Sequence, residues 1–385
     1  MAWNIHDLHD AIFGTDARKQ VGRKLKEYGC TKAVVIYDPA LKDYVGEVME
    51  LIEAEGLQAV IYQAANGEPV SSEVEKYVDF CKKEQIDGMV ALGGGSTMDT
   101  AKIGGKTLAN GGKVTDYLGG YTALGAGNKL FKPIICMATT SGTGSEVSYG
   151  LMCLNEENNK KTFCLHTATL AIDDPIYPAN MDPYITAYTG IDALAHCAES
   201  LCNTYAMENW MADMLCKEGV KTAFDYLRTA VKEPDNTEAR ARMSWAAMCG
   251  GYAITERKTS IGHSVSNQIS DTFHTHHGEG VACGILVQAL YNVKKSPEIT
   301  KVWAPLFGVD CPEDADLETV GREIYKKLLD LLKDIGLKSM KKLGISEDFC
   351  DTAAENISKD KKWAIVPNPP DFEEVRRCLH ETWDF

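Results

Sequence analysis

No C-x-x-C pair occurs among the 13 cysteines of this 385-residue chain, and the cysteines are scattered along it. This spacing excludes the common iron–sulfur and zinc-ribbon sites, and an odd number of cysteines cannot pair fully within one chain. The first 23 residues carry charges throughout, and no apolar run approaches the roughly 18 residues that span a bilayer. We therefore expect a cytoplasmic protein with reduced thiols and no membrane association.

Basic residues are also few, with 40 Lys and Arg against 55 Asp and Glu, which makes the formal net charge −15. Because nucleic acids and anionic membranes are bound mainly through Lys and Arg, neither is expected as a main partner. The hydrophobic content of 44% is ordinary for a folded globular protein. At about 150 residues per domain, the length predicts two or three domains.

The first half of the chain alternates predicted strands and helices, which is typical of a parallel α/β sheet. Predicted strands lie at residues 32–37, 57–62, 88–92 and 134–138, and predicted helices at 45–55, 73–84 and 97–109. Beyond the prolines at 175, 178 and 183 the periodicity is helical, at 187–200, 206–227, 237–254, 317–335 and 371–382. The sequence therefore predicts an N-terminal α/β domain, residues 1–182, and an all-α C-terminal domain, residues 183–385.

Two loops that follow predicted strands are suited to phosphate or dinucleotide binding. The first is G-G-G-S-T-M-D at 93–99, and the second is T-T-S-G-T-G-S-E at 139–146. Glycines let backbone amides approach an anion, the next helix adds partial positive charge, and Ser96 could cap that helix. Neither loop matches G-x-G-x-x-G or the Walker pattern. Asp38, at the end of the first strand, is either a ribose-binding carboxylate or part of an Asp-Pro turn.

The helical half concentrates metal-ligand residue types. Asp192 and His196 stand four residues apart, on one face of a predicted helix. His263 and His277 are 14 residues apart, about 21 Å along an unbroken helix, so a shared site requires the helix to end before Thr275. We expect Gly278 and Gly280 to supply the flexible backbone of that turn. One carboxylate and three imidazoles suit Fe²⁺ or Zn²⁺; the alternative is a solvated histidine-rich loop.

Together, G-G-G-S-x-x-D, T-T-x-G-T-G-S-E, G-I-D-A-x-x-H and the late His-Gly that follows an upstream histidine by 14 residues resemble the iron-containing (group III) alcohol dehydrogenase family. The resemblance covers nearly the whole chain. It implies a dehydroquinate synthase-like two-domain architecture with the active site between the domains. It also implies oligomers, commonly dimers or larger.

The resemblance assigns roles to residues of this sequence. The implied metal ligands are Asp192, His196, His263 and His277. The implied cofactor-binding residues are Asp38, Asn66, Gly94, Gly95, Ser96, Asp99, Thr139, Thr140, Thr143, Ser145 and Lys161. Asp38 favours NAD(H) over NADP(H), because a carboxylate accepts from the ribose 2′-hydroxyl and repels a 2′-phosphate.

The chain departs from the family pattern at the position where many members carry a histidine that helps to relay the alcohol proton. Here that position is Asn267, which can orient a water or substrate oxygen but is neither acid nor base. Proton exchange then needs His274 or His276, a ribose hydroxyl or bulk water. The alternative for both histidines is a supporting role at the metal site or plain surface exposure.

A second departure is Arg257-Lys258, where many members have small residues facing the substrate. These cations suggest a substrate with an acidic group, and the alternative is a salt bridge to Glu256 or to another subunit. The sequence thus predicts an NAD(H)-linked dehydrogenase or reductase for a small primary alcohol or aldehyde, with Fe²⁺ or Zn²⁺ acting as a Lewis acid. A dehydroquinate-synthase-like lyase and a non-catalytic NAD-binding protein are the alternative functions.

Overall fold

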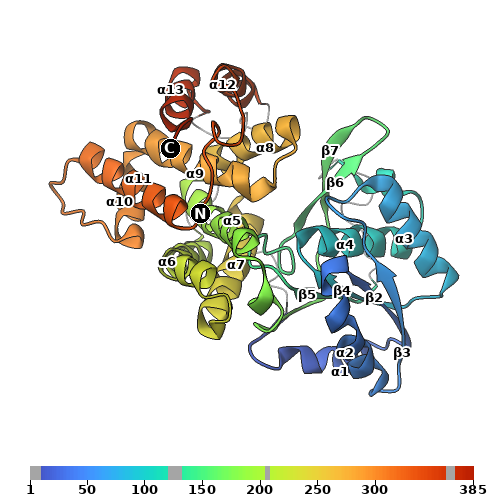
Figure 1. Cartoon of the computed structure of the whole chain (residues 1–385). Coiled ribbons are helices and arrows are strands. Elements are labelled where there is room, and N and C mark those ends of the chain that lie inside the picture. The colour runs from blue at the N-terminus through green and yellow to red at the C-terminus, as the bar shows by residue number, and fades with distance from the viewer. Residues whose placement is uncertain (1–9, 120–131, 204–208, 361–368) are drawn as a thin grey trace. The chain divides into compact units, whose positions relative to one another are not determined.

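The computed structural model describes residues 10–119, 132–203, 209–360 and 369–385, which divide into two compact units (Figure 1). The α/β unit comprises Asp7–Thr140 and Gly144–Pro178, and the helical unit comprises Ala179–Phe385 together with Ser141–Thr143. The units thus separate after Pro178, a few residues before the predicted boundary, and three residues of the second loop group with the helices.

The α/β unit is built on a six-stranded parallel sheet with the strand order β1-β8-β5-β4-β2-β3. The strands are β1 (Asp10–Phe13), β2 (Lys32–Tyr37), β3 (Gln58–Gln63), β4 (Gly88–Gly93), β5 (Ile134–Ala138) and β8 (Leu170–Asp173). The parallel α/β fold predicted from the sequence is confirmed. Since the strands are parallel, the segments that follow β2, β4 and β5 all leave from the same edge of the sheet.

Helices cover both faces of this sheet (Figure 1). They are α1 (Val21–Glu27), α2 (Lys42–Glu53), α3 (Ser71–Lys83) and α4 (Gly95–Asn110). Alternate strand residues point to opposite faces, so Val35 packs in one apolar cluster with α1 and α2, whereas Val34 packs in another with α3 and α4. Burial on both faces explains the near-continuous apolar runs of the strands.

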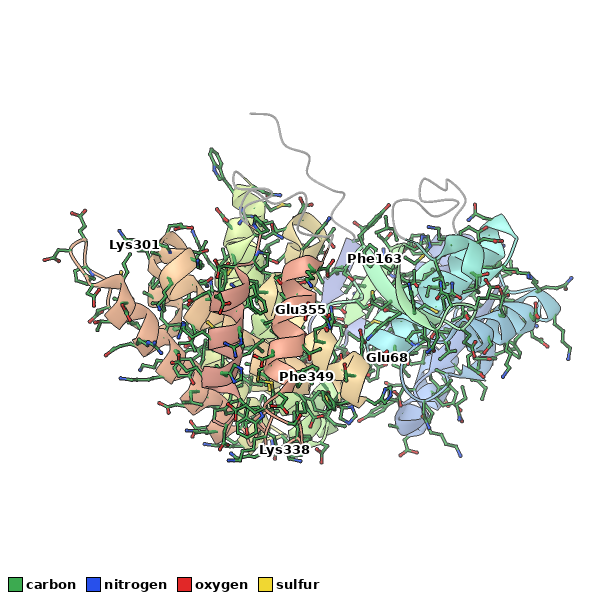
Figure 2. All side chains as sticks on the ribbon, turned by 90° about the horizontal axis from the view of Figure 1, so that it is seen from above. Glu68, Phe163, Lys301, Lys338, Phe349 and Glu355 are labelled. Carbon is green, nitrogen blue, oxygen red and sulfur yellow. The ribbon has the colours of Figure 1, made fainter. Side chains whose placement is uncertain are left out.

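A separate antiparallel hairpin consists of β6 (Gly150–Asn155) and β7 (Lys160–Leu165), and the sequence analysis did not predict it. One of its faces is buried, with Leu151, Cys153 and Cys164 packed against residues of α3 and α4. Its other face includes Phe163, which is 38% exposed and is labelled in Figure 2. The run Leu-Met-Cys-Leu in β6 is continuously apolar, so the sequence shows none of the apolar–polar alternation that identifies a strand with one buried face.

The helical unit confirms the predicted all-α half. Its helices are α5 (Pro183–Cys202), α6 (Trp210–Lys232), α7 (Thr237–Arg257), α8 (Ile261–Phe273), α9 (His277–Lys295), α10 (Pro297–Trp303), α11 (Leu317–Asp334), α12 (Phe349–Lys359) and α13 (Phe372–Thr382). The start predicted for α6, residue 206, lies outside the described residues. None of the described helices is long and apolar enough to cross a membrane.

Candidate functional site

Helix α5 carries the first two predicted metal ligands on one face. It begins sharply because the Asp182 side chain accepts hydrogen bonds from the backbone of Tyr184 at 2.8 Å and of Ile185 at 3.3 Å, and Pro183 occupies the first helical position. Residues around most of the helix are buried, so the face that carries Asp192 and His196 lies inside the unit, at 3% and 6% exposure.

The other two predicted ligands lie on either side of the turn between α8 and α9. As predicted, the helix that carries His263 ends before Thr275, and the chain turns back. The residue that makes the turn is His274, in the left-handed conformation at φ 54°, so the prediction that Gly278 and Gly280 form it was wrong. Both glycines lie inside α9.

Close packing explains these two glycines better than flexibility does. A Cβ atom at Gly278 would stand 2.0 Å from the backbone oxygen of Tyr188, and one at Gly280 would stand 2.8 Å from Oγ of Ser266. The missing side chains let the start of α9 lie directly against α5 and α8. This packing brings His277, the first residue of α9, toward Asp192.

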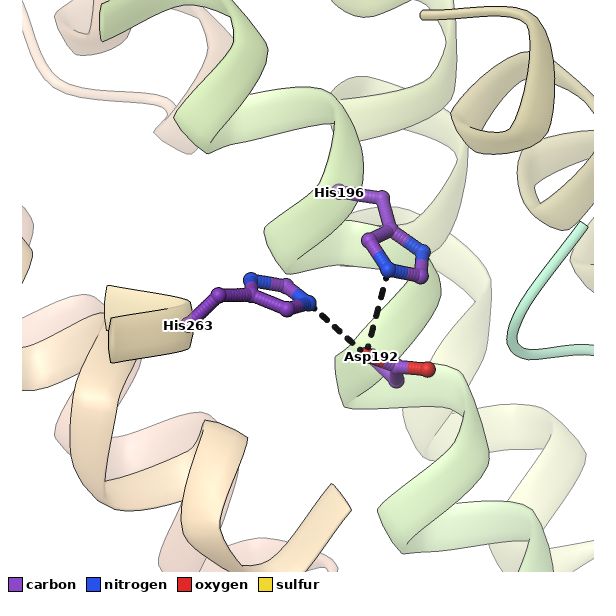
Figure 3. A group of neighbouring side chains, drawn as sticks. All are labelled: Asp192, His196 and His263. Carbon is purple, nitrogen blue, oxygen red and sulfur yellow. Dashed lines mark ion pairs between the residues drawn. The ribbon is translucent and has the colours of Figure 1, made fainter. Parts of the chain in front are cut away.

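Oδ1 of Asp192 is the point on which the imidazoles converge, as Figure 3 shows for two of them. It lies 3.6 Å from Nε2 of His196, 3.3 Å from Nε2 of His263 and 3.7 Å from Nε2 of His277. Asp192, His196 and His263 form a buried group whose ligand atoms all lie within 4.8 Å of one another. The structure thus places side chains of all four predicted ligand residues, Asp192, His196, His263 and His277, around one carboxylate oxygen.

The arrangement fits a divalent ion. Ligand atoms arranged tetrahedrally about 2.1 Å from an ion are about 3.4 Å apart, close to the measured separations. Within the described part of the chain, Oδ1 of Asp192, Nδ1 of His196 and Nε2 of His263 are buried without a hydrogen-bond partner. Buried polar atoms are rarely left unpaired, so a metal ion that coordinates Oδ1 of Asp192 and Nε2 of His263 would satisfy two of them.

A fifth residue of this cluster, Glu199, was missed in the sequence. It is fully buried on α5, and its Oε1 lies 2.7 Å from Nδ1 of His263. Its Oε2 accepts hydrogen bonds from the backbone N–H of Ser260 at 2.8 Å and of His263 at 3.0 Å, which caps α8. A carboxylate on the far nitrogen of a ligating histidine fixes the ring and its tautomer. The spacing D-x-x-x-H-x-x-E on one helix face was the available signal.

The charges of the cluster are strongly coupled. Burial alone would oppose ionisation of Asp192, but His196, His263 and His277 hold the pKa of its carboxyl below the usual range. Burial likewise opposes a charge on His263, yet Glu199 and Asp192 outweigh it and raise the pKa of this imidazole to about 10. Burial lowers the pKa of His196, so Asp192 and His263 are shifted toward their charged forms and His196 toward its neutral form.

Of the three residues predicted to take part in proton exchange, Asn267 lies within α8, and His274 and His276 lie at the turn that follows it. Asn267, His274 and His276 are all exposed. The ring of His276 stacks on Tyr188 with centroids 4.9 Å apart, and its backbone N–H donates to Oε2 of Glu279 at 3.1 Å. This contact caps α9 next to His277, so His276 has a supporting role in the fold whether or not it transfers protons.

The two predicted substrate cations differ in their surroundings. Arg257 is only 3% exposed, and its guanidinium lies 2.7 Å from Oδ1 of Asp213 and donates to the backbone oxygen of Asn209 at 3.2 Å. Lys258 follows α7 with φ 64°, and its backbone oxygen accepts from Oγ of Ser200. Asp213 already balances the charge of Arg257, so a substrate anion would have to compete with it.

In the α/β unit, both predicted cofactor loops lie at the carboxyl edge of the sheet. β4 and β5 are neighbours, and a Cβ atom at Gly94 would stand 3.2 Å from Oγ1 of Thr140, so the loops are adjacent. α4 begins at Gly95, which leaves its first backbone N–H groups beside Gly94 and Ser96 as an anion site. The prediction that Ser96 caps α4 was wrong, since the N-cap residue is Gly94.

Asp38 lies at the point where the strand order reverses, between β2 and β4, which is where open α/β sheets bind ligands. Its backbone N–H donates to Leu92 at 3.1 Å, and its Oδ1 accepts from the N–H of Ala40 at 2.9 Å. Asp38 thus takes part in the predicted Asp-Pro turn.

The other predicted cofactor residues differ in their surroundings, some lying near the surface and others bonded to one another or buried. Asn66 is exposed beyond β3, and Lys161 on β7 pairs with Glu68, which is labelled in Figure 2. Asp99 and Ser145 bond to each other instead, with Oγ of Ser145 donating to Oδ1 of Asp99 at 2.6 Å. Thr139 is buried, and Thr143 groups with the helical unit.

Comparison with known families agrees with this geometry. Residues 9–175 match the description "Iron-containing alcohol dehydrogenase", and residues 186–383 match "Fe-containing alcohol dehydrogenase family, C-terminal". The chain belongs to this family.

Relatives and solved structures show the same assignment along the whole length of the chain. A choline dehydrogenase of Bacillus subtilis is 30% identical over 96% of this chain and 93% of its own length. An NAD-dependent methanol dehydrogenase of Bacillus methanolicus is 29% identical over 96% of this chain and 97% of its own. The structure of an alcohol dehydrogenase from Oenococcus oeni, 25% identical, superposes with a TM-score of 0.89 over 98% of this chain and all of that one.

Proposed function

We propose that this protein is a metal-dependent, NAD(H)-linked dehydrogenase of a small primary alcohol, or a reductase of the corresponding aldehyde. The observation that carries the proposal is the buried group of Asp192, His196 and His263, whose ligand atoms lie within 4.8 Å of one another in a member of the iron-containing alcohol dehydrogenase family. His277 completes the ligand set. Fe²⁺ is the ion that the family description supports, with Zn²⁺ the alternative.

The chain's own residues prepare this centre for a substrate oxygen. Asp192, His196, His263 and His277 would hold the ion, and Glu199 orients His263. When bound, a divalent ion supplies Lewis acidity that favours the alkoxide in one direction and a polarised carbonyl in the other. The apolar, largely buried surroundings of α5 exclude water, which strengthens every charge interaction at the site.

The α/β unit supplies the groups that a dinucleotide requires. The first turn of α4 and the adjacent Gly94 and Thr140 offer backbone N–H groups and a hydroxyl to the pyrophosphate. Asp38 offers a carboxylate to the ribose. The relative from Bacillus methanolicus is described as NAD-dependent, which supports NAD(H) as the cofactor.

Part of the second cofactor loop lies close to the helix that carries Asp192 and His196. Ser141–Thr143 belong to the second cofactor loop in the sequence, yet they group with the helical unit. There Ser141 Oγ lies 3.0 Å from Oγ of Ser244, and a Cβ atom at Gly142 would stand 2.9 Å from Thr189 on α5. Thr189 precedes Asp192 by less than one helical turn.

Proton exchange with the alcohol is proposed to use exposed residues in α8 and at the turn that follows it. Asn267 cannot accept a proton, so it would orient a water or the substrate oxygen. His274 or His276 would exchange the proton with solvent. Cytoplasmic location and a homo-oligomeric state are further parts of this proposal.

The substrate class is tested through the pair of Arg257 and Asp213. If Arg257 holds an acidic substrate, Arg257→Ala should raise KM for acidic aldehydes, and Asp213→Asn should lower it, because the competing carboxylate is gone. Both variants break the same ion pair, so both should lose stability, by about 2 kcal/mol for a partly exposed pair. If the variants change KM equally for acidic and neutral aldehydes, Arg257 has a structural role and does not bind the substrate.

The activity itself is tested with protein purified and reloaded with Fe²⁺ under anaerobic conditions. NADH should accumulate in equal amount to the aldehyde formed, and a metal-free sample should bind NADH without turnover. A product formed without net change in NAD would favour the lyase alternative. Binding of NADH with no product from any alcohol of a broad panel would favour a non-catalytic NAD-binding protein.

A further inference from the structure

Helix α4 carries two charged residues that the proposed dinucleotide site does not use directly. Asp99 and Lys102 stand one turn apart, with side-chain exposures of 14% and 0%. Nζ of Lys102 lies 3.6 Å from Oδ1 of Asp99. A buried lysine and carboxylate are expensive to desolvate, so their presence requires partners and a reason.

Their partners all lie in or just after the second loop. Oδ1 of Asp99 accepts from Oγ of Ser145 at 2.6 Å, and Oδ2 accepts from the backbone N–H of Met152 at 3.0 Å. Nζ of Lys102 donates to the backbone oxygens of Ser145 at 2.8 Å and of Ser148 at 3.4 Å. The helix that opens at the first loop therefore holds the backbone of the second.

The second loop depends on such support because its own backbone is irregular. Gly144 has φ 61°, and its oxygen accepts from the N–H groups of both Val147 and Ser148. Between β5 and β6 the segment has no helix or strand of its own. Its part from Gly144 onward is therefore held by these local bonds and by the two side chains of α4.

A second buried lysine on the same helix, Lys106, offers a matched comparison for Lys102, because it holds a segment outside both cofactor loops. Lys106 follows Lys102 by one turn, is 2% exposed, and donates to the backbone oxygen of Leu165 at 2.7 Å. Leu165 ends β7 and lies outside both loops. The two lysines match in residue type, helix and burial, and they differ in the segment that they hold.

We propose that Asp99 and Lys102 are positioning residues for the dinucleotide, which lock the second cofactor loop to the helix that begins at the first. They act through the backbone that they hold, by keeping the two loops in the geometry that binds the cofactor. The ion pair lies within the fold and is complete before the cofactor arrives, so the site is preorganised. This inference rests on the proposed NAD(H) binding.

The test measures the Kd of NADH by fluorescence for the wild type, Lys102→Met and Lys106→Met, each with its urea unfolding curve. Lys102→Met should weaken NADH binding by about 10- to 100-fold, because a small displacement of binding groups has effects of this size. Lys106→Met should destabilise the fold similarly and change the Kd by less than about two-fold.

The double variant Asp99→Asn/Lys102→Met covers the case in which Lys102→Met does not fold, because it leaves no unpaired buried charge. It should also bind NADH weakly while its unfolding curve stays close to that of the wild type. A wild-type Kd in any folded Lys102 variant, or equal weakening in Lys106→Met, would overturn the inference alone. No NADH binding by the wild type would overturn the proposed function and the inference with it.

Discussion

The two units of this protein build their sites in opposite ways. On the side of the α/β unit, each proposed nucleotide loop is a single continuous segment, and backbone N–H groups, glycines and hydroxyls are the groups proposed to meet the ligand. In the helical unit, the proposed metal ligands are side chains from three helices, with Asp192 and His196 on α5, His263 on α8 and His277 on α9. One site depends on the course of the backbone, and the other on where side chains converge.

Both proposed sites nevertheless share one feature. In each, a buried charged side chain hydrogen-bonds to a residue or loop that is proposed to bind the ligand. Lys102 holds the backbone of the second loop, and Glu199 holds the ring of His263. In each case the supporting group lies on the same helix as a residue of the motif. The comparison teaches that the predicted ligand-contacting motifs can be identified in the sequence, whereas the supporting role of Glu199 and Lys102 is established by their three-dimensional contacts.

The largest effect is expected from a substitution at the proposed metal site, which should abolish metal binding and leave NADH binding almost unchanged. Asp192→Asn replaces the anionic carboxylate on which all three imidazoles converge with a neutral amide, a much weaker ligand for a divalent ion, so it should abolish metal retention. Alcohol-dependent NADH formation should fall by about a thousand-fold or more, since a Lewis acid is worth several kcal/mol of transition-state stabilisation. The Kd of NADH should stay within about two-fold of the wild type, as for independent sites. A large rise in that Kd would show that the two sites are not separate.

A smaller effect is expected from the support of the metal centre. Glu199→Ala leaves every ligand in place but frees Nδ1 of His263, so metal affinity in a chelator competition should fall by about 10- to 100-fold. Glu374→Ala is the control, because Glu374 is a buried carboxylate paired with Arg377 on α13. If both variants bind Fe²⁺ as the wild type does, Glu199 only caps α8.

The smallest effect concerns cofactor choice at the sheet edge. Asp38→Gly removes the carboxylate that would repel a 2′-phosphate, so the ratio of kcat/KM for NADP⁺ to that for NAD⁺ should rise by about ten-fold. Metal affinity should not change. Because the Oδ1 contact with Ala40 is lost as well, Asp38→Asn serves as the control that keeps this turn. If the ratio of kcat/KM for NADP⁺ to that for NAD⁺ is unchanged in both variants, Asp38 has only a structural role in the Asp-Pro turn.

The sequence predicted the parallel sheet and the helical half because apolar periodicity directly reflects burial, as in the fully buried strand β5. It predicted a shared metal cluster because ligand types gathered in a few segments. It misplaced the turn before α9, because Gly278 and Gly280 reflect close packing on Tyr188 and Ser266, which local sequence does not reveal. The roles of Glu199 and Lys102 were missed in the sequence. Charged residues are usually exposed, so the sequence alone does not show that these two are buried and hold other groups.

Transfer of the label from an alcohol deuterated at its carbinol carbon tests the central claim most directly. With Fe²⁺-loaded wild type and NAD⁺, the account predicts that deuterium appears at C4 of the nicotinamide in equal amount to the aldehyde formed. Metal-free protein and Asp192→Asn should transfer none. Aldehyde formed without deuterium in the nicotinamide, or full transfer by the metal-free protein, would contradict metal-dependent hydride transfer.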